Sequence, residues 1–350
     1  MKPATSIISE NPELWDIFTL KDESALSKIN NYRSALSVYN KSPNILNPRV
    51  SRFLLEKGFC VEYPDNRQFA VCLTHDVDEI YPPIHHTLLS SLHCLKDMDL
   101  AGFKDQMFWR LRENAWSPYR NFREIIELED KYNAKSSFYF LATDRDIKRF
   151  RYNVEDIELD IGDIMDRGWE VGLHGGYYAV DDPEAIRDEK VRLERLTGQD
   201  VVGYRNHYLR LHIPRTWEIL SELGFRYDTT LGYNDKLGFR NGMCHPFKPF
   251  NLDTGAYMDI LQIPLVIMDG TLFSSVKSYG EAWGMAKQLV DSVADCHGVL
   301  TLNWHSDSFG CPFRQSWPHL YEKILQYCSN KNAWMTSGIE ICKWWQYNDY

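Results

Sequence analysis

The stretch AVCLTHDVDEI, residues 70–80, begins with four apolar residues and ends in a cluster of ionisable ones. The apolar part predicts a buried strand. Asp76 and Asp78 are two residues apart, so on an extended chain their side chains point the same way. One carboxylate there could bind a divalent metal while the other takes a proton from the metal's water. The alternative is that both acids lie in a solvated loop and cap the next helix.

Six more apolar runs follow and alternate with helical patterns, which predicts an α/β fold with a parallel sheet. The sheet is either doubly wound or closed into a barrel. The runs lie at 136–142, 169–176, 200–208, 225–232, 259–267 and 298–305. The helical patterns lie at 121–133, 160–168, 183–198, 214–224 and 281–298. Residues 1–65 are polar and rich in Ser and Asn, so we expect an N-terminal helical extension packed on a main domain of residues 66–350.

Composition excludes some classes of partner. The net charge of the 350-residue chain is -10 and there is no Lys/Arg block, which argues against nucleic acid. No window is apolar for long enough to span a membrane, and MKPATSIISENPELW lacks the apolar core of a secretory signal. We therefore expect a cytoplasmic protein without a membrane span. The scattered cysteines fit free thiols in a reducing compartment; they are Cys60, Cys72, Cys94, Cys244, Cys296, Cys311, Cys328 and Cys342.

Unusual polar residues also close three of the later apolar runs. They are His174, Arg205 with His207, and His305. Because the carboxyl ends of the strands form the active-site face of an α/β barrel, we expect these side chains to converge with the two acids. Taken singly, Arg205 could form a surface ion pair, and His305 could be a hydrogen-bonded core residue.

The order and spacing of these motifs, from about residue 68 to 305, resemble the polysaccharide deacetylase (NodB-type) superfamily, carbohydrate esterase family 4. LTHDVD matches the family's first motif, a strand that ends in T-F-D-D or a D-x-D variant. The resemblance implies a distorted (β/α)7-type barrel for residues 66–350. It also implies that Asp76 is the catalytic base and Asp78 the metal-binding acid.

The family's second motif, H-x-x-x-H, is matched by VGLHGGYYA only in part. His174 occupies the place of the first metal ligand, but Tyr178 stands where the second histidine is expected. A third ligand could come from His207, Tyr178 or His75. We prefer His207, which follows the adjacent strand, and rank His75 last because it faces away from Asp76 on an extended strand. The implied cofactor is a divalent metal, with Zn²⁺ the first choice.

Three further motifs supply the remaining roles implied by the resemblance. In GYRNHYL, Arg205 would pair with the base, and a backbone N–H near Tyr208 would serve the oxyanion. In YDTTLGY, Asp228 would orient the acid histidine, although it could instead be a helix or turn cap. In LTLNWH, His305 would be the general acid that protonates the leaving amine.

The sequence therefore predicts a metal-dependent N-deacetylase that hydrolyses the acetamide of an amino sugar. The expected substrate is an amino sugar or glycan precursor in a cytoplasmic pathway. One alternative is an amidase that acts on small molecules with the same scaffold. The other is a carbohydrate-binding relative that has lost its metal and its catalysis.

Overall fold

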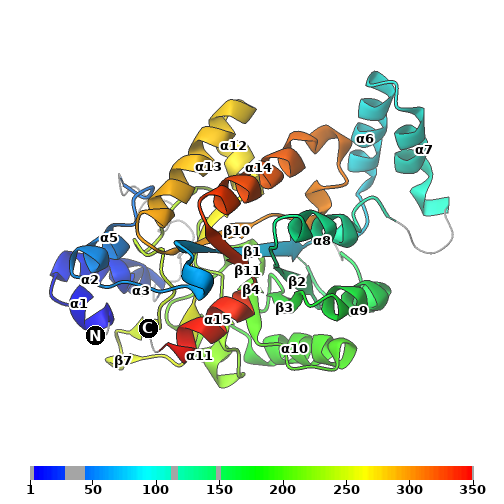
Figure 1. Cartoon of the computed structure of the whole chain (residues 1–350). Coiled ribbons are helices and arrows are strands. Elements are labelled where there is room, and N and C mark those ends of the chain that lie inside the picture. The colour runs from blue at the N-terminus through cyan, green and yellow to red at the C-terminus, as the bar shows by residue number, and fades with distance from the viewer. Residues whose placement is uncertain (1–3, 28–43, 112–116, 147–150, 349–350) are drawn as a thin grey trace.

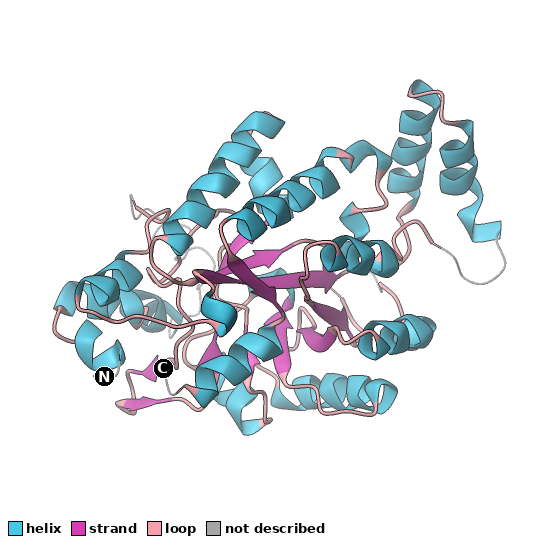
Figure 2. Cartoon of the chain, in the orientation of Figure 1, coloured by secondary structure: helices cyan, strands magenta, loops and turns pink. Residues whose placement is uncertain are grey.

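A curled parallel sheet lies at the centre of the molecule and helices surround it (Figures 1 and 2). The structure, a computed structural model, describes residues 4–27, 44–111, 117–146 and 151–348. The strands are β1 Phe69–Val77, β2 Ser137–Leu141, β3 Glu170–Gly175, β4 Gly203–Asn206, β5 Tyr227–Asp228, β6 Phe250–Asn251, β7 Ala256–Tyr257, β8 Leu261–Gln262, β9 Leu265–Met268, β10 Val299–Asn303 and β11 Ala333–Thr336. The α-helices are α1 Ala4–Ile8, α2 Pro12–Phe18, α3 Lys21–Ser27, α5 Arg49–Glu56, α6 Ile84–Lys96, α7 Leu100–Phe108, α8 Phe122–Asp130, α9 Glu158–Asp166, α10 Pro183–Thr197, α11 Arg215–Glu222, α12 Asp269–Ser275, α13 Tyr279–Ala294, α14 Ser316–Asn330 and α15 Gly338–Tyr347. Short 3₁₀ turns are η1 Pro64–Asn66, η2 Trp109–Leu111, η3 Val154–Ile157, η4 His207–Leu209, η5 Ser306–Ser308 and η6 Pro312–Arg314.

The sheet curls into a half-barrel, and its two outermost strands are neighbours in the sequence. The strand order is β8-β5-β4-β3-β2-β1-β10-β9, and all these pairs are parallel. Only residues 263–264 join β8 to β9, so the two ends of the sheet lie close together. Pro264, which has no N–H to donate, lies where the sixth predicted strand is split in two. The predicted distorted (β/α)7-type barrel is confirmed.

Strand β1 lies in the middle of the sheet and pairs with three others. One edge pairs with β10 along residues 70–74. On the other edge, β11 pairs with residues 69–72 and β2 with residues 74–77. Strand β11 was not predicted from the sequence, because its four residues lack a clear alternation.

Alternate residues of β1 pack into two different hydrophobic clusters. Phe69, Val71 and Leu73 belong to the cluster that contains α13 and α14, whereas Ala70 and Cys72 belong to the other. This alternation has the period of two expected for a strand. It fixes which of the polar residues that follow face the barrel interior and which face the helices.

The N-terminal helices pack at the end of the barrel away from the carboxyl ends of the strands. The backbone carbonyl of Cys244 accepts a hydrogen bond from the N–H of Val299, the first residue of β10 (2.7 Å). The backbone N–H of Cys244 donates to the hydroxyl of Ser51 in α5 (2.9 Å). Val50 of α5 also donates to the carbonyl of Gly242 (3.0 Å). The helices of residues 1–65 that the structure describes therefore cover the opposite end of the barrel. Division into two units at residue 65 stays a prediction.

Two predictions about the chain as a whole can be compared with the structure. All eight cysteines are free thiols, as expected. Among the described residues, none of the helices has the length and apolar character that crossing a bilayer requires.

Candidate metal centre

The carboxyl ends of β1, β3, β4 and β10 surround one pocket of about 510 Å³. Its lining includes the two acids and three histidines that the sequence singled out, which are Asp76, Asp78, His174, His207 and His305. The strands run parallel, so residues at their carboxyl ends reach the same rim although they are far apart in the sequence. The predicted convergence is confirmed for these five side chains.

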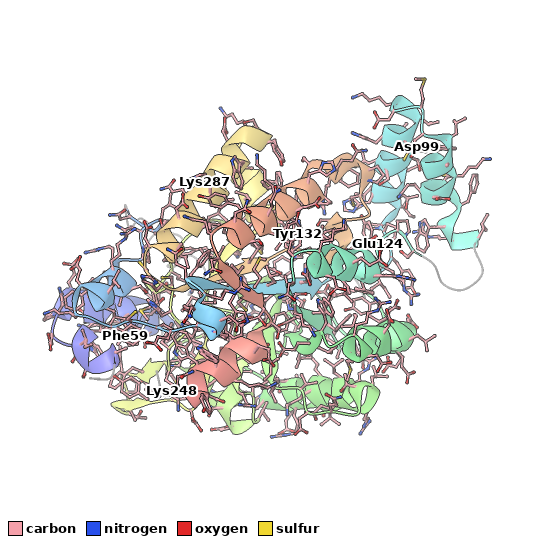
Figure 3. All side chains as sticks on the ribbon, viewed as in Figure 1. Phe59, Asp99, Glu124, Tyr132, Lys248 and Lys287 are labelled. Carbon is pink, nitrogen blue, oxygen red and sulfur yellow. The ribbon has the colours of Figure 1, made fainter. Side chains whose placement is uncertain are left out.

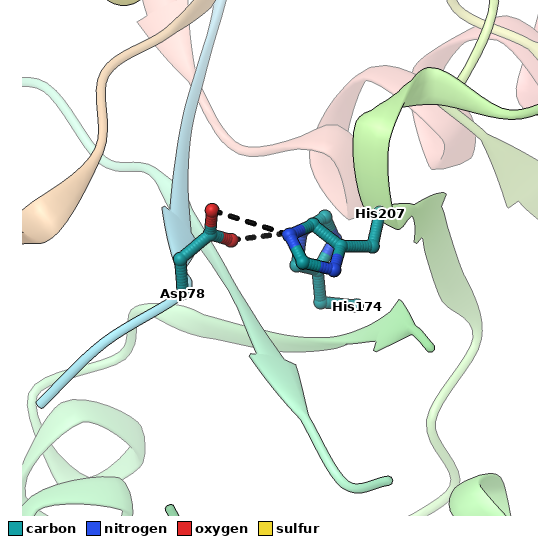
Figure 4. A group of neighbouring side chains, drawn as sticks. All are labelled: Asp78, His174 and His207. Atoms are coloured by element: carbon teal, nitrogen blue, oxygen red, sulfur yellow. Dashed lines mark ion pairs between the residues drawn. The ribbon is translucent and has the colours of Figure 1, made fainter. Parts of the chain in front are cut away.

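Asp78, His174 and His207 form a close group in this pocket (Figure 4). Their candidate ligand atoms all lie within 4.8 Å of one another. His174 Nε2 is 3.1 Å from Asp78 Oδ1, and His207 Nε2 is 3.4 Å from Asp78 Oδ2. These are the residues that the sequence analysis preferred as metal ligands.

The hydrogen bonds of His174 show that a divalent cation suits this group. His174 Nδ1 lies 3.0 Å from the carbonyl oxygen of Arg205, which can only accept a proton. In a neutral ring, Nε2 then presents a lone pair to the Asp78 carboxylate. Two such acceptors are stabilised by a cation between them. Two imidazoles and one carboxylate, with the pocket side open, are a donor set typical of catalytic Zn²⁺.

A second carboxylate lies behind His207. Asp146 Oδ1 is 3.6 Å from His207 Nδ1, and Asp146 also contacts the guanidinium of Arg151. A carboxylate at the far nitrogen of a ligating histidine favours the tautomer whose other nitrogen is open. Asp146 was not found from the sequence, because it lies in a loop after β2 and belongs to none of the motifs.

The three candidates for a third ligand lie at different distances from Asp78. Tyr178 is 45% exposed, and its ring stacks under the guanidinium of Arg145 (4.5 Å) rather than joining the group. His75 faces the other side of β1, as the alternation predicted, and hydrogen-bonds to Glu129 (2.8 Å). Of these three candidates, His207 is the one that reaches Asp78.

Asp76 lies beside the group with its carboxylate held by two side chains. Arg205 donates to Oδ1 (2.9 Å) and Asn303, at the end of β10, donates to Oδ2 (2.7 Å). Burial alone would raise the pKa of Asp76, but Arg205 and then His174 hold this pKa below its ordinary value. Asp76 therefore stays ionised. The predicted pairing of Arg205 with Asp76 is confirmed; Asn303, within LTLNWH, was not anticipated.

The partner of His305 differs from the prediction. Asp269, the first residue of α12, accepts from the His305 backbone N–H (2.9 Å) and lies 2.6 Å from His305 Nδ1. Burial alone would lower the pKa of His305, but Asp269 raises it well above its ordinary value. His305 Nε2 faces the pocket, 3.9 Å from Asp78 Oδ2.

The predicted role of Asp228 as the orienter of His305 is therefore wrong. Asp228 is fully buried near the start of the next loop, where its Oδ1 accepts from the backbone N–H of Thr230 (2.9 Å). Its Oδ2 accepts from the indole of Trp217 (3.2 Å). Burial raises the pKa of Asp228 to about 6. The alternative reading, a turn cap, fits these contacts.

Comparison with known proteins identifies the fold. No protein-family model matches the sequence, and no curated protein matches it either. A protein from Mycobacterium smegmatis assigned as a polysaccharide deacetylase is 18% identical over 83% of this chain and 94% of its own, with a TM-score of 0.57. One from Pseudomonas aeruginosa PAO1 with the same assignment is 15% identical over 81% and 93%, with a TM-score of 0.54. The PuuE allantoinase is 17% identical over 81% and 92%, with a TM-score of 0.54.

At these identities the likeness establishes the fold and leaves the chemistry to be argued from the site. The chain has the polysaccharide deacetylase fold, so the resemblance drawn from the motifs is confirmed at that level. The comparisons assign no role to the pocket residues.

Proposed function

We propose that this protein is a metal-dependent hydrolase that removes an acyl group, most naturally acetyl, from the nitrogen of an amino sugar. The observation that carries the proposal is the arrangement around one pocket. A candidate metal group of Asp78, His174 and His207 lies between a buried carboxylate, Asp76, and an imidazole, His305. A base, an acid and an electrophile around one reacting bond are what amide hydrolysis needs.

Asp78, His174 and His207 would hold the divalent metal, with Zn²⁺ the expected ion. When bound, the ion supplies positive charge that polarises the acyl oxygen and makes water more acidic. Asp76 takes a proton from the attacking water, and its ion pair with Arg205 keeps it ready to do so. The backbone N–H of Tyr208, in a turn that lines the pocket, donates to the oxygen that becomes negative.

His305 then gives a proton to the departing nitrogen. With Nδ1 held by Asp269, the proton that it gives comes from Nε2, on the pocket side. Asp269 raises the pKa of His305 and so favours its imidazolium form. The acid is therefore charged before the step begins and neutral after it, so atoms and charge balance.

An amino sugar fits the character of the pocket. Beyond the ionisable group, the lining carries short polar side chains, among them Asn234, Thr271 and Ser274. A volume of about 510 Å³ is in the range of small-molecule sites. The cytoplasmic glycan pathway, and acetyl as the particular acyl group, are part of the proposal.

Hydrolysis of a small nitrogen-rich amide is the second candidate. It is favoured by the likeness of the fold to the PuuE allantoinase. Both candidates use the same residues and differ only in what fills the pocket.

The test is a turnover assay on the zinc-loaded protein. Acetate release is measured from N-acetylated amino sugars, and ring opening or amine release from cyclic ureides and simple amides. We expect acetate release that Asp76→Asn abolishes. Turnover of ureides alone would replace the substrate class, and a protein that binds zinc but turns over neither class would contradict the proposed function.

A further inference from the structure

The helical hairpin of α6 and α7 stands away from the barrel and has an inverted distribution of polarity. In Figure 1 the two helices project from one corner of the molecule, and in Figure 3 the labelled Asp99 marks the turn between them. The large apolar side chains of α6 face solvent, while its small and polar ones are buried. A helix that packs on a water-soluble core has the opposite arrangement.

The inside of the hairpin is made of small residues. Thr87, Ser91 and Cys94 are each 5% exposed or less, and the Ser91 hydroxyl donates to the Thr87 carbonyl within the helix (2.8 Å). On α7, a Cβ added at Gly102 would lie 3.1 Å from Cys94 Sγ. The two helices thus approach closely where Cys94 meets Gly102, and Ser91 satisfies its hydroxyl within α6.

The outside of α6 is a stripe of large apolar residues. Ile84, Leu88, Leu92 and Leu95 recur at spacings of four, four and three residues, which places them on one face. Ile84 is 70% exposed and Leu92 64%. Other exposed apolar side chains lie in the same part of the chain, which are Leu89 in α6 itself, Met98 in the turn, Leu100 and Phe108 in α7, and Leu111 in η2. So many large apolar side chains exposed on one hairpin are unusual for a protein that meets only water.

We propose that the α6–α7 hairpin is a docking surface for a lipid bilayer. Small residues between helices and leucines outside are the arrangement of helices that face lipid. Helix α6 has 13 residues, too few to cross a bilayer, so the hairpin lies in the interface.

Charge favours neutral lipid as the occupant. Between residues 84 and 111, Lys96, Lys104 and Arg110 are balanced by three aspartates, whereas the whole chain carries -10. The hairpin has no net charge, so it can contact a bilayer without bringing the negative charge of the rest of the chain to the lipid. Attraction rests on apolar area, so anionic lipid weakens it rather than strengthening it.

The hairpin begins at the mouth of the candidate active site. His85 and His86, in the first turn of α6, line the same pocket as Asp78 and His305. The leucine stripe therefore leads outward from the pocket. Docking through it would bring the pocket to the membrane surface, where an amphiphilic substrate lies. Lipid docking itself does not rest on the proposed hydrolysis.

The test is sedimentation of the full-length, zinc-loaded protein with sucrose-loaded phosphatidylcholine vesicles. The variant Leu88→Gln/Leu92→Gln removes two residues of the stripe. The matched control, Leu159→Gln/Val191→Gln, makes the same change at two exposed positions on α9 and α10, away from the hairpin. We expect the hairpin variant to lower the partition coefficient at least about tenfold and the control to leave it within about twofold.

Thermal unfolding of both variants checks that they fold, since all four positions are exposed. A parent protein that stays in the supernatant overturns the proposal, as does equal sedimentation of parent and hairpin variant. Stronger binding to vesicles that contain phosphatidylserine also overturns it. So does a parent that stays in the supernatant as a dimer which the hairpin variant converts to a monomer, because the face would then bind a second copy of the chain. None of these results depends on hydrolytic activity.

Discussion

Strand β1 carries two buried polar clusters that face opposite ways, and they differ in how fully the protein satisfies them. On the helix side, His75 has both ring nitrogens occupied, by the carbonyl of Trp304 (2.7 Å) and by Glu129 (2.8 Å). Glu129 is also hydrogen-bonded by three more groups, the side chains of Ser136, Trp169 and Tyr321. On the barrel side, the Nε2 atoms of His174 and His207 converge on Asp78 at the pocket.

The difference teaches that burial and residue type do not by themselves mark a functional site. Both clusters contain histidine and carboxylate, and both include a residue of β1 or of the segment that follows it. The first is closed, because each polar atom meets a protein partner, as buried polar groups require. The second brings the Nε2 atoms of two histidines and the oxygens of a carboxylate together at the pocket, a set of atoms that a bound cation would stabilise.

The largest expected effect is on turnover, and it comes from a change in the barrel-side cluster. Asp76→Asn removes the base but keeps the shape of the side chain, so we expect turnover to fall about 10²–10⁴-fold with the zinc content unchanged. Steady-state assays together with elemental analysis measure both. A variant that keeps most of its turnover would mean that Asp76 is not the base.

In the helix-side cluster, the same kind of substitution lowers stability instead of turnover. Glu129→Gln replaces a fully buried carboxylate that accepts hydrogen bonds from Ser136, Trp169 and Tyr321, and the new NH₂ group meets donors. We expect the free energy of unfolding to decrease by about 3 kcal/mol, because breaking a buried pair leaves polar groups unsatisfied. Denaturant titration measures the loss. Zinc lost in proportion would show that the two clusters are not separate.

A third buried histidine, His245, should make the stability of the fold depend on pH. His245 contacts Ser51 through Nδ1 (2.9 Å), and among the described residues no carboxylate hydrogen-bonds to it. Burial lowers the pKa of His245 from 6.5 to about 4. Between these values the unfolded chain binds the proton and the folded chain does not, so stability is lost as pH falls from about 6.5 to about 4.

The size of this loss follows from the shift and is at most about 3 kcal/mol. His245→Gln should remove that part of the pH dependence, seen as the difference between parent and variant in denaturant titrations across this range. Parallel curves for the two proteins would contradict the assignment.

The smallest expected effect is on kcat, and it distinguishes the role of Asp269 from that of Asp228. Asp269→Asn weakens the contact to His305 Nδ1, so we expect kcat to fall about tenfold and KM to change little. Asp228→Asn acts on Trp217 and Thr230 and should lower the melting temperature more than kcat. The reverse pattern would restore the role that the sequence motif suggested for Asp228.

Much of the site could be predicted because its signal is local. Side chains alternate along the run from Ala70 to Asp78. This alternation predicts the strand, the side of it that faces the pocket, and the opposite orientation of His75. Arg205 and His305 could be placed because they end apolar runs.

What was missed depends on contacts that the sequence does not reveal locally. Asp269 begins α12, 36 positions before His305, and joins it only because β9 and β10 are neighbours in the sheet. The helices of the α6–α7 hairpin were not among those predicted, and a leucine stripe such as that of α6 ordinarily predicts a face buried in the core, whereas here that face is exposed.

The most direct test of the account is the zinc content of the purified protein after equilibrium dialysis against buffered zinc. It compares the parent with Asp78→Ala, His174→Ala, His207→Ala and the control Tyr178→Phe. The account predicts near-stoichiometric zinc in the parent and in Tyr178→Phe, and loss of it in the other three. Zinc retained in His207→Ala but lost in Tyr178→Phe, or a parent that binds none, would contradict the proposed centre.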